Sequence, residues 1–329
     1  MRILFVGDVM LGRLVNETLK TAPPDHPWGN TLSVFQKADV RMANLECVIS
    51  DRGNPWTVTP KVFRFRTDAK NVEALRIAQI NAVSLANNHT LDFEYEAMFE
   101  MIKILDKAGI SHAGAGANFE EASRPALWET NGIKVGLIAF TDNEPDWEAT
   151  DQRPGIFYVP IDREDDRAKT LFEIVRDTQK EVDLLIVSAH WGPNWGYSPR
   201  RNHIPFGHAL IDQGAHIVFG HSCHVFQGIE IYQERPILYS TGDFIDDYAV
   251  DEIERNDESF IFMVEIEEEK ITKLHLFPTL IRNFQTRLAG GKEAGKIARK
   301  METLCAEFQT PAEWNDKEKA MDILFSRSL

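Results

Sequence analysis

Short apolar segments, several of which end in polar residues, alternate along this sequence with segments of helical periodicity. The first is Arg2–Val6, which stops at Gly7-Asp8. Further predicted strands lie at 38–45, 82–85, 134–140, 184–188 and 217–219. Between them, apolar residues recur at helical spacing, as in Glu94–Ala108, a predicted helix that Gly109 ends. Strands that alternate with helices in this way indicate an α/β core.

The pattern changes after residue 228. Four short predicted strands follow with little helix between them, at 228–232, 236–240, 260–266 and 271–277. The end of the chain is charged and predicted to be helical, as a peripheral tail or lid. We therefore expect one domain over 1–285 and a helical C-terminal appendage over 286–329. The long loop Asp51–Thr67 is a candidate functional segment, because long ordered loops in compact domains are often functional.

Charge and composition limit the classes of partner. The 329 residues carry a formal net charge of −15, which argues against a nucleic-acid-binding protein, since such a protein needs a basic surface. An anionic substrate would need a local positive site such as a metal cluster. No apolar run approaches the roughly 18 residues of a membrane span, and Asp8 interrupts the only N-terminal run that resembles a signal peptide. We expect a cytoplasmic protein with reduced thiols; the oligomeric state stays open.

Residues that can bind metal ions follow the apolar segments one after another. In order they are Asp8, Glu46, Asn88, His190, His221 and His224. Because ligand sites in open α/β sheets gather beyond the carboxyl ends of the strands, these side chains are expected to converge. Such donors suit Mn, Fe, Zn or Co, and six of them are more than one tetrahedral ion needs. Two divalent ions that share a carboxylate would use them all.

Each of these residues has a simpler explanation when it is taken alone. Asp8 is the kind of residue that caps a helix, and Asn87-Asn88-His89 is typical of a turn. The segment Gly220–His224 is more specific, because two histidines three positions apart after a buried strand are unusual as packing residues. A purely structural α/β protein would need all six residues at these positions by coincidence. The ordered set therefore favours a metal centre.

The order of these motifs resembles the calcineurin-like metallophosphoesterase superfamily and, within it, the CapA family of poly-γ-glutamate synthesis or capsule biosynthesis proteins. The matching segments are GDVMLGR (7–13), ADVRMANLE (38–46), SLANNHTLD (84–92), SAHWG (188–192), GAHIVFGHSCHVFQGIE (214–230) and ILYSTGDFIDD (237–247). They cover residues 1 to about 250 in order. The resemblance implies a metallophosphoesterase-like fold, a four-layer α/β/β/α sandwich with its site at the strand ends.

The resemblance also implies hydrolysis by a metal-bound hydroxide, which attacks a phosphoester or a γ-glutamyl-type amide. Glu46 is then the bridging carboxylate. Asp8 and His224 complete one site, and Asn88, His190 and His221 complete the other. His89 would protonate the leaving group or stabilise its charge, and Asp92 would orient His89.

The chain departs from the family pattern at several positions. Met10 stands where the superfamily has a histidine, and Glu46 stands where it has an aspartate. Asn194 lies near the place where CapA-like proteins have an acidic residue after HWG. Asp243 replaces the asparagine of the family's Gly-Asn-Phe, so that it either supplies a missing ligand or changes the polarity near the substrate.

Three arginines are candidates for binding a small or polymeric anionic substrate. Arg13, Arg64 and Arg66 could each clamp carboxylate or phosphate oxygens, or could be solvated surface residues. Two functions remain open. The ligand set favours a metal-dependent hydrolase. Met10 and the family's biosynthetic role favour a non-catalytic accessory protein that binds an acidic polymer in poly-γ-glutamate or capsule biosynthesis.

Overall fold

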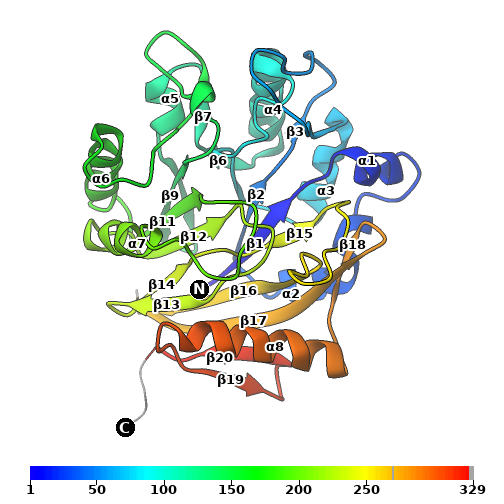
Figure 1. Cartoon of the computed structure of the whole chain (residues 1–329), viewed down its shortest axis with the longest axis vertical. Coiled ribbons are helices and arrows are strands. Elements are labelled where there is room, and N and C mark those ends of the chain that lie inside the picture. Colours follow the sequence, from blue (N-terminus) through cyan, green and yellow to red (C-terminus); the bar gives the residue numbers. More distant parts are fainter. Residues whose placement is uncertain (269, 326–329) are drawn as a thin grey trace.

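Two β-sheets packed face to face form the centre of the molecule (Figure 1). The structure is a computed structural model that describes residues 1–268 and 270–325. The ten-stranded sheet has the main order β19 (Ala312–Asn315), β20 (Ala320–Ile323), β17 (Lys270–Arg282), β16 (Glu258–Glu267), β1 (Arg2–Val9), β2 (Val40–Leu45), β5 (Ala82–Ser84), β6 (Ser111–Ala113). In addition, β15 (Asp243–Ile245) pairs with β1, and β18 (Gln285–Leu288) pairs with β17.

The second sheet has six strands. Their order is β13 (Ile229–Tyr232), β14 (Arg235–Leu238), β12 (Ile217–His221), β11 (Leu184–His190), β9 (Ile133–Thr141), β8 (Ala126–Thr130). Two small pairs complete the strands: β3 (Val48–Ile49) with β4 (Arg66–Thr67), and β7 (Ala115–Gly116) with β10 (Gly155–Ile156). Strands β1, β2, β5 and β6 run parallel, as do β9, β11, β12 and β14.

The apolar runs in the sequence are continuous because each central strand is buried on both faces. In β1, Ile3 and Phe5 face the core between the sheets, whereas Leu4 and Val6 face the outer core of the ten-stranded sheet. This is the two-residue alternation of a pleated strand. Strand β11 alternates in the same way between the inner core and the outer core of its own sheet.

Helices cover the outer face of each sheet. The ten-stranded sheet is covered by α1 (Arg13–Leu19), α2 (Leu32–Phe35), α3 (Val72–Ile77) and α4 (Glu94–Ala108). The six-stranded sheet is covered by α6 (Asp166–Thr178) and α7 (His203–Asp212), with the short α5 (Phe119–Ser123) beside them. The four layers are visible in Figure 1. The expected α/β/β/α sandwich is confirmed.

The C-terminal segment differs from the wholly helical one that the sequence predicts. One helix, α8 (Gly291–Ala306), is followed by the hairpin β19–β20, and β20 pairs with β17. Ile297, Met301 and Cys305 of α8 belong to the core between the sheets. Figure 1 shows α8 and the hairpin along β17, at the lower end of the sandwich. The sequence predicts a peripheral segment because its composition is charged, but the charged residues of α8 lie on its outer face and its apolar face is buried.

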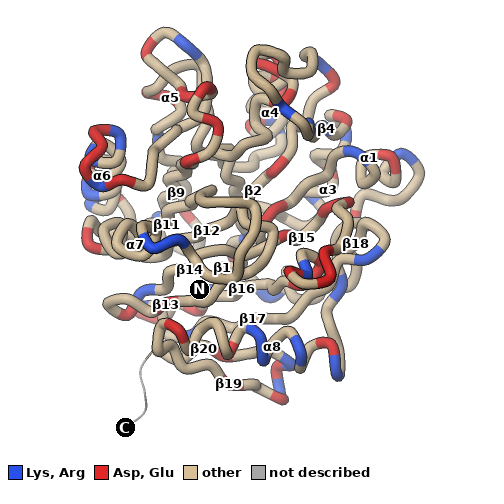
Figure 2. The backbone as a smooth tube through the Cα atoms, viewed as in Figure 1, with Lys and Arg blue, Asp and Glu red and all other residues tan. Residues whose placement is uncertain are grey.

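Charged residues lie mainly on the outer helices and loops, with Lys and Arg interspersed among Asp and Glu (Figure 2). Within the described part of the chain, we find no helix with the length and hydrophobicity that a membrane crossing requires. Cys47, Cys223 and Cys305 are buried and form no disulfide.

Candidate metal centre

Strand pairing brings the predicted ligands together. Asp8, near the end of β1, is paired with Asn44 in β2 on one side and with Asp243 in β15 on the other. In the second sheet, His190 and His221 are direct partners at the ends of β11 and β12. Because the parallel strands of each sheet end on the same edge, these side chains meet between the two sheets.

Gly7 is what allows β15 to lie so close to β1. A Cβ atom at this position would fall 1.8 Å from the carbonyl oxygen of Gly242. The backbone N–H of Asp8 donates a hydrogen bond of 3.0 Å to that same carbonyl. The Gly-Asp pair at the start of the chain therefore places the Asp8 carboxylate beside that of Asp243.

Two groups of ligand-type side chains share Asp8. One group contains Asp8, His190 and His221, and the other contains Asp8, Glu46, His224 and Asp243. Within each group, one donor atom of every residue lies within 4.8 Å of the others. Asp8, rather than the Glu46 that the resemblance implies, is therefore the residue common to both groups. Asp243 lies among the ligand-type residues. This position is required if Asp243 supplies a missing ligand, which is one of the two roles considered for it from the sequence.

A turn with unusual backbone angles places His224. Strand β12 ends at His221, and Ser222 and His224 then adopt positive φ values of 108° and 25°. Non-glycine residues rarely adopt such angles, and those that do cluster at functional sites. The turn folds His224 back, so that its Nδ1 lies 2.9 Å from Oδ1 of Asp243.

Protein side chains do not supply enough positive charge to balance the buried carboxylates of this cluster. Burial raises the pKa of Asp8 to about 6 and, together with repulsion between the carboxylates, raises the pKa values of Glu46 and Asp243 well above their usual range. Asp246 adds a fourth buried carboxyl nearby, whose pKa is also raised by burial. A bound divalent cation would remove this repulsion and keep the carboxylates ionised.

Unpartnered atoms give a second test of whether metal ions fit. Among the buried side-chain atoms that have no hydrogen-bond partner within residues 1–268 and 270–325, five belong to the ligand-type residues: Asp8 Oδ2, Glu46 Oε2, Asn88 Oδ1, His190 Nε2 and Asp243 Oδ2. Buried polar atoms normally have partners, so a cluster of five without them is unusual. All five are oxygen or imidazole nitrogen, the donors that divalent first-row metals take. The residues therefore fit a metal centre.

The histidines are in the state that metal binding requires. Burial lowers the pKa of His221 to about 3, and burial, together with the neighbouring histidines and Lys61, holds the pKa of His190 well below its usual range. Both rings are therefore neutral at physiological pH, as ligating imidazoles must be. Their Nδ1 atoms lie 2.9 Å apart, and Ser188 Oγ lies 2.7 Å from Nε2 of His221.

His89 lies next to the cluster and is fixed by Asp92. Nδ1 of His89 and Oδ2 of Asp92 are hydrogen-bonded at 2.6 Å, and Phe65 stacks on the imidazole with ring centroids 3.9 Å apart. The other ring nitrogen, Nε2, lies 4.0 Å from a carboxylate oxygen of Glu46. Burial lowers the pKa of His89 and raises that of Asp92 to about 8. His89 thus lies beside the cluster, and Asp92 is the hydrogen-bond partner of its Nδ1.

Lys61 is a buried cation that sequence reasoning did not single out. Its side chain is only 7% exposed and lies 2.8 Å from Glu144 and 3.8 Å from Asp92. Its ammonium also donates to the backbone carbonyl of Asn88 and lies 4.7 Å from the ring centroid of Trp147. Lys61 therefore ties the loop Asp51–Thr67 to the turn that carries Asn88 and His89. The only feature of the sequence that pointed to Lys61 was the unusual length of this loop.

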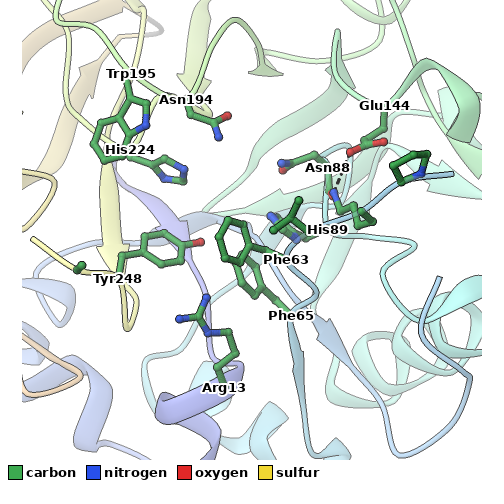
Figure 3. A pocket seen from close by; sticks show the side chains of 14 residues that line it. Arg13, Phe63, Phe65, Asn88, His89, Glu144, Asn194, Trp195, His224 and Tyr248 are labelled. Atoms are coloured by element: carbon green, nitrogen blue, oxygen red, sulfur yellow. Dashed lines mark hydrogen bonds and ion pairs between the residues drawn. The ribbon is translucent and has the colours of Figure 1, made fainter. Parts of the chain in front are cut away.

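A cavity of about 510 Å³ lies beside the cluster and is the place where a substrate would enter (Figure 3). Asn88, His89 and His224 line it together with Arg13. Arg64 and Arg66 line a separate hollow with Arg13 and donate hydrogen bonds to backbone carbonyls of Trp56, Arg52 and Gly53. Of the three candidate arginines, Arg13 alone belongs to the lining of the central cavity.

Two asparagines hold the cluster from outside. The Nδ2 atom of Asn44 donates to Asp8 Oδ1 at 2.8 Å, and Asn87 donates to the side chain of Asn44 at 3.0 Å. Both belong to the sequence motifs, but strand ends alone did not distinguish them. Met10, at the position where the sequence resemblance implies a histidine, is fully buried in the outer core of the ten-stranded sheet, where its sulfur accepts a hydrogen bond from the N–H of Gly12.

Comparisons with known proteins show which family the chain resembles. Residues 2–248 match the family described as bacterial capsule synthesis protein PGA_cap. The probable polyglutamine synthesis accessory protein of Mycobacterium tuberculosis is 38% identical over 229 residues, which are 68% of this chain and 60% of that protein. The PGA biosynthesis protein CapA of Bacillus subtilis is 26% identical over 245 residues, covering 74% of this chain and 62% of that one.

The matched region is a part of each of these relatives, at about three fifths of their length. A solved structure, a hypothetical protein from Thermus thermophilus, aligns with a TM-score of 0.50 at 15% identity, over 84% of this chain and 98% of that one, and shares the fold. Since the family match spans most of the sequence and the ordered motifs lie within it, the chain belongs to the bacterial capsule synthesis protein (PGA_cap, or CapA) family.

Proposed function

We propose that the chain is a metal-dependent hydrolase that acts on an anionic phosphoester or γ-glutamyl-type amide. The observation that carries the proposal is the pair of ligand groups that share Asp8, together with unpartnered buried donor atoms around them. Asp8, His190, His221 and Asn88 would hold one divalent ion, and Asp8, Glu46, His224 and Asp243 would hold a second. Bound ions of this kind lower the pKa of water and so supply a nucleophile near neutral pH.

The residues around the cluster have separate tasks in this reaction. The oxygen of water bonds to the phosphorus or carbonyl carbon, the bond to the leaving group breaks, and the leaving atom takes up a proton. His89 is placed to deliver that proton, because it lines the cavity and lies beside Glu46. Asp92 holds the ring of His89, and Lys61 holds the peptide that joins His89 to Asn88.

The amide alternative follows from the names of relatives, two of which refer to PGA biosynthesis and polyglutamine synthesis. A second candidate function is a non-catalytic accessory role in which the same cleft binds an acidic polymer. The relative named as an accessory protein favours it, as does Met10 in place of the superfamily's histidine.

Metal analysis followed by an activity screen separates the two functions. We expect the purified chain to bind Mn²⁺ and, when loaded, to hydrolyse bis-p-nitrophenyl phosphate or γ-glutamyl-p-nitroanilide. His221→Ala and Asp8→Asn should lose both the metal and the activity. His112→Ala is the matched control, because His112 pairs with Asp106 on the far side of β5 from the cluster. Full metal content without turnover of any probe would support the accessory role instead.

A further inference from the structure

The cavity beside the cluster has an aromatic wall that hydrolysis by itself does not need. Ring contacts run from Trp195 to His224 at 5.5 Å between centroids, from His224 to Tyr248 at 5.0 Å, and from Tyr248 to Phe65 at 5.7 Å. Phe63 continues the wall beyond Phe65 at 6.5 Å. Figure 3 shows the rings of Trp195, Tyr248 and Phe63 around the same space. The wall includes His224, a proposed ligand, so it adjoins the place where the reaction would occur.

Two of these aromatic side chains are more exposed to solvent than large aromatic residues usually are. Phe63 is 60% exposed and Trp195 is 44% exposed, although both line the cavity. Exposed apolar side chains around a concave site are typical of ligand binding. The phenol of Tyr248 adds a buried hydroxyl that has no hydrogen-bond partner among the described residues.

Arg13 supplies a positive charge at this wall. Its guanidinium carbon lies 5.5 Å from the ring centroid of Phe65 and 5.9 Å from that of Tyr248. Asp247 accepts its Nε–H at 3.1 Å, and its Nη atoms make no hydrogen bond to any residue that the structure describes. Arg13 also adopts a positive φ of 50°, an angle that residues other than glycine rarely adopt. Its free donors can therefore bind one anionic group.

The charges of the lining disfavour a ligand with many carboxylates. The lining of the cavity contains one arginine, Arg13, and one lysine, Lys61. The ammonium of Lys61 already contacts Glu144, Asp92 and the backbone carbonyl of Asn88. Glu144 itself lines the cavity and would repel a further carboxylate. A polymer with a carboxylate on every residue would thus meet a single available cation outside the metal centre.

We propose that this cavity binds a small anionic ligand that carries an aromatic or other planar group next to its reacting bond. Arg13 contacts the anionic part, and Phe63, Trp195 and Tyr248 contact the planar part. A volume of about 510 Å³ suits a ligand of that size. The inference rests on the proposed function in one respect: it assigns the reacting group to the metal-ligand cluster.

Two phosphonates of equal charge test the proposal without any need for turnover. Phenylphosphonate and methylphosphonate differ by the ring, and their affinities for the full Mn²⁺-loaded chain can be measured by calorimetry. We expect phenylphosphonate to bind at least about tenfold more tightly, as expected for burial of an aromatic ring. Phe63→Ala and Trp195→Ala should each remove most of this difference. Arg13→Gln should weaken both ligands alike.

Val58→Ala is the matched control for Phe63→Ala. Val58 lies on the same loop, is 75% exposed and does not line the cavity, so this variant should keep the full preference. Equal affinities for the two phosphonates, binding of neither, or tighter binding of a γ-glutamyl hexamer than of phenylphosphonate would overturn the proposal.

Failure of the proposed function gives a different result. If no ester or amide probe is hydrolysed but the ring preference and its dependence on Phe63 persist, the ligand class stands and the hydrolase does not. If probes are hydrolysed with no preference for a planar group, the hydrolase stands and the ligand class is wrong.

Discussion

His89 and His221 lie at the same site but differ in their position relative to the two groups of ligand-type residues. His221 lies inside a ligand group, 3.7 Å from Asp8, and it is fully buried. His89 lies outside both groups, with one nitrogen tied to Asp92 and the other directed toward Glu46 at the edge of the cavity. The proposed ligand His221 and the proposed proton donor His89 can therefore be told apart by whether a substitution first removes the metal or the turnover.

We expect His89→Ala to keep its metal and to lower kcat by about 10²–10⁴, the usual contribution of a positioned acid or base. The measurements are metal content and steady-state kinetics on whichever probe is hydrolysed. His221→Ala serves as the contrast and should lose metal first. Turnover of His89→Ala at the wild-type rate would show that His89 is structural, and loss of metal as complete as in His221→Ala would make it a ligand.

At the scale of elements, the contact between β1 and β15 controls the geometry of the cluster. Strand β15 brings Asp243 alongside Asp8, and this close approach depends on the missing side chain of Gly7. A shift of β15 by even a few tenths of an ångström would change the distance between two of the proposed ligands.

Gly7→Ala should therefore reduce metal affinity and destabilise the fold by roughly 3 kcal/mol or more, in line with severe overpacking of a core. Its Cβ would meet backbone atoms of Gly242, which cannot move aside as a side chain can. Urea unfolding and metal titration of the variant check this. Gly290→Ala is the control, since a Cβ there meets nothing within 4 Å. A Gly7→Ala protein with wild-type stability and metal affinity would contradict the assignment.

His216 joins β11 to the segment that enters β12 and makes their pairing sensitive to pH. The backbone N–H of Leu185 donates to Nδ1 of His216 at 2.9 Å, so the neutral ring is required. Burial, with a smaller effect of Arg235, lowers the pKa of His216 to about 4. Between that value and the unfolded value near 6.5, the unfolded chain binds more protons.

The stability that His216 contributes should be fully present above about pH 6.5 and should be lost as the pH falls toward 4. The loss should reach roughly 2–3 kcal/mol in the free energy of unfolding. His216→Asn offers an acceptor oxygen that does not titrate, so this variant should lose less stability over the same range. Urea denaturation of both proteins at pH 7 and pH 4.5 measures the difference. Parallel losses in the two proteins would show that His216 is not responsible.

At the scale of the whole molecule, the C-terminal segment completes the core between the sheets. Met301 of α8 is fully buried there, among residues from both sheets. Removal of its side chain should cost about 2–5 kcal/mol, the range for large-to-alanine changes in a core.

We therefore expect Met301→Ala to lower the stability of the entire chain in one cooperative transition. Glu302→Ala, on the exposed face of the same helix, should change stability by less than about 0.5 kcal/mol. Thermal unfolding followed by circular dichroism compares the two. A separate low-temperature transition in the Met301→Ala protein would show instead that α8 and the hairpin unfold as an independent unit.

Local sequence determined the α/β core and the residues from which the candidate site is built. Apolar strands, several of which end in Asp, Glu, Asn or His, predict an α/β core and the edge at which the site lies, because strand direction and strand ends are local properties. The four layers are implied by the resemblance of the ordered motifs to a known family. The tertiary structure alone decided that Asp8 is shared by both ligand groups, that Asp243 joins them, and that Lys61 reaches Asn88 from a distant loop. It also decided that the charged C-terminal segment adds β20 to the sheet and α8 to the core. These features depend on the pairing register and the packing of segments that are far apart in the chain. The periodicity of a single segment therefore cannot predict them.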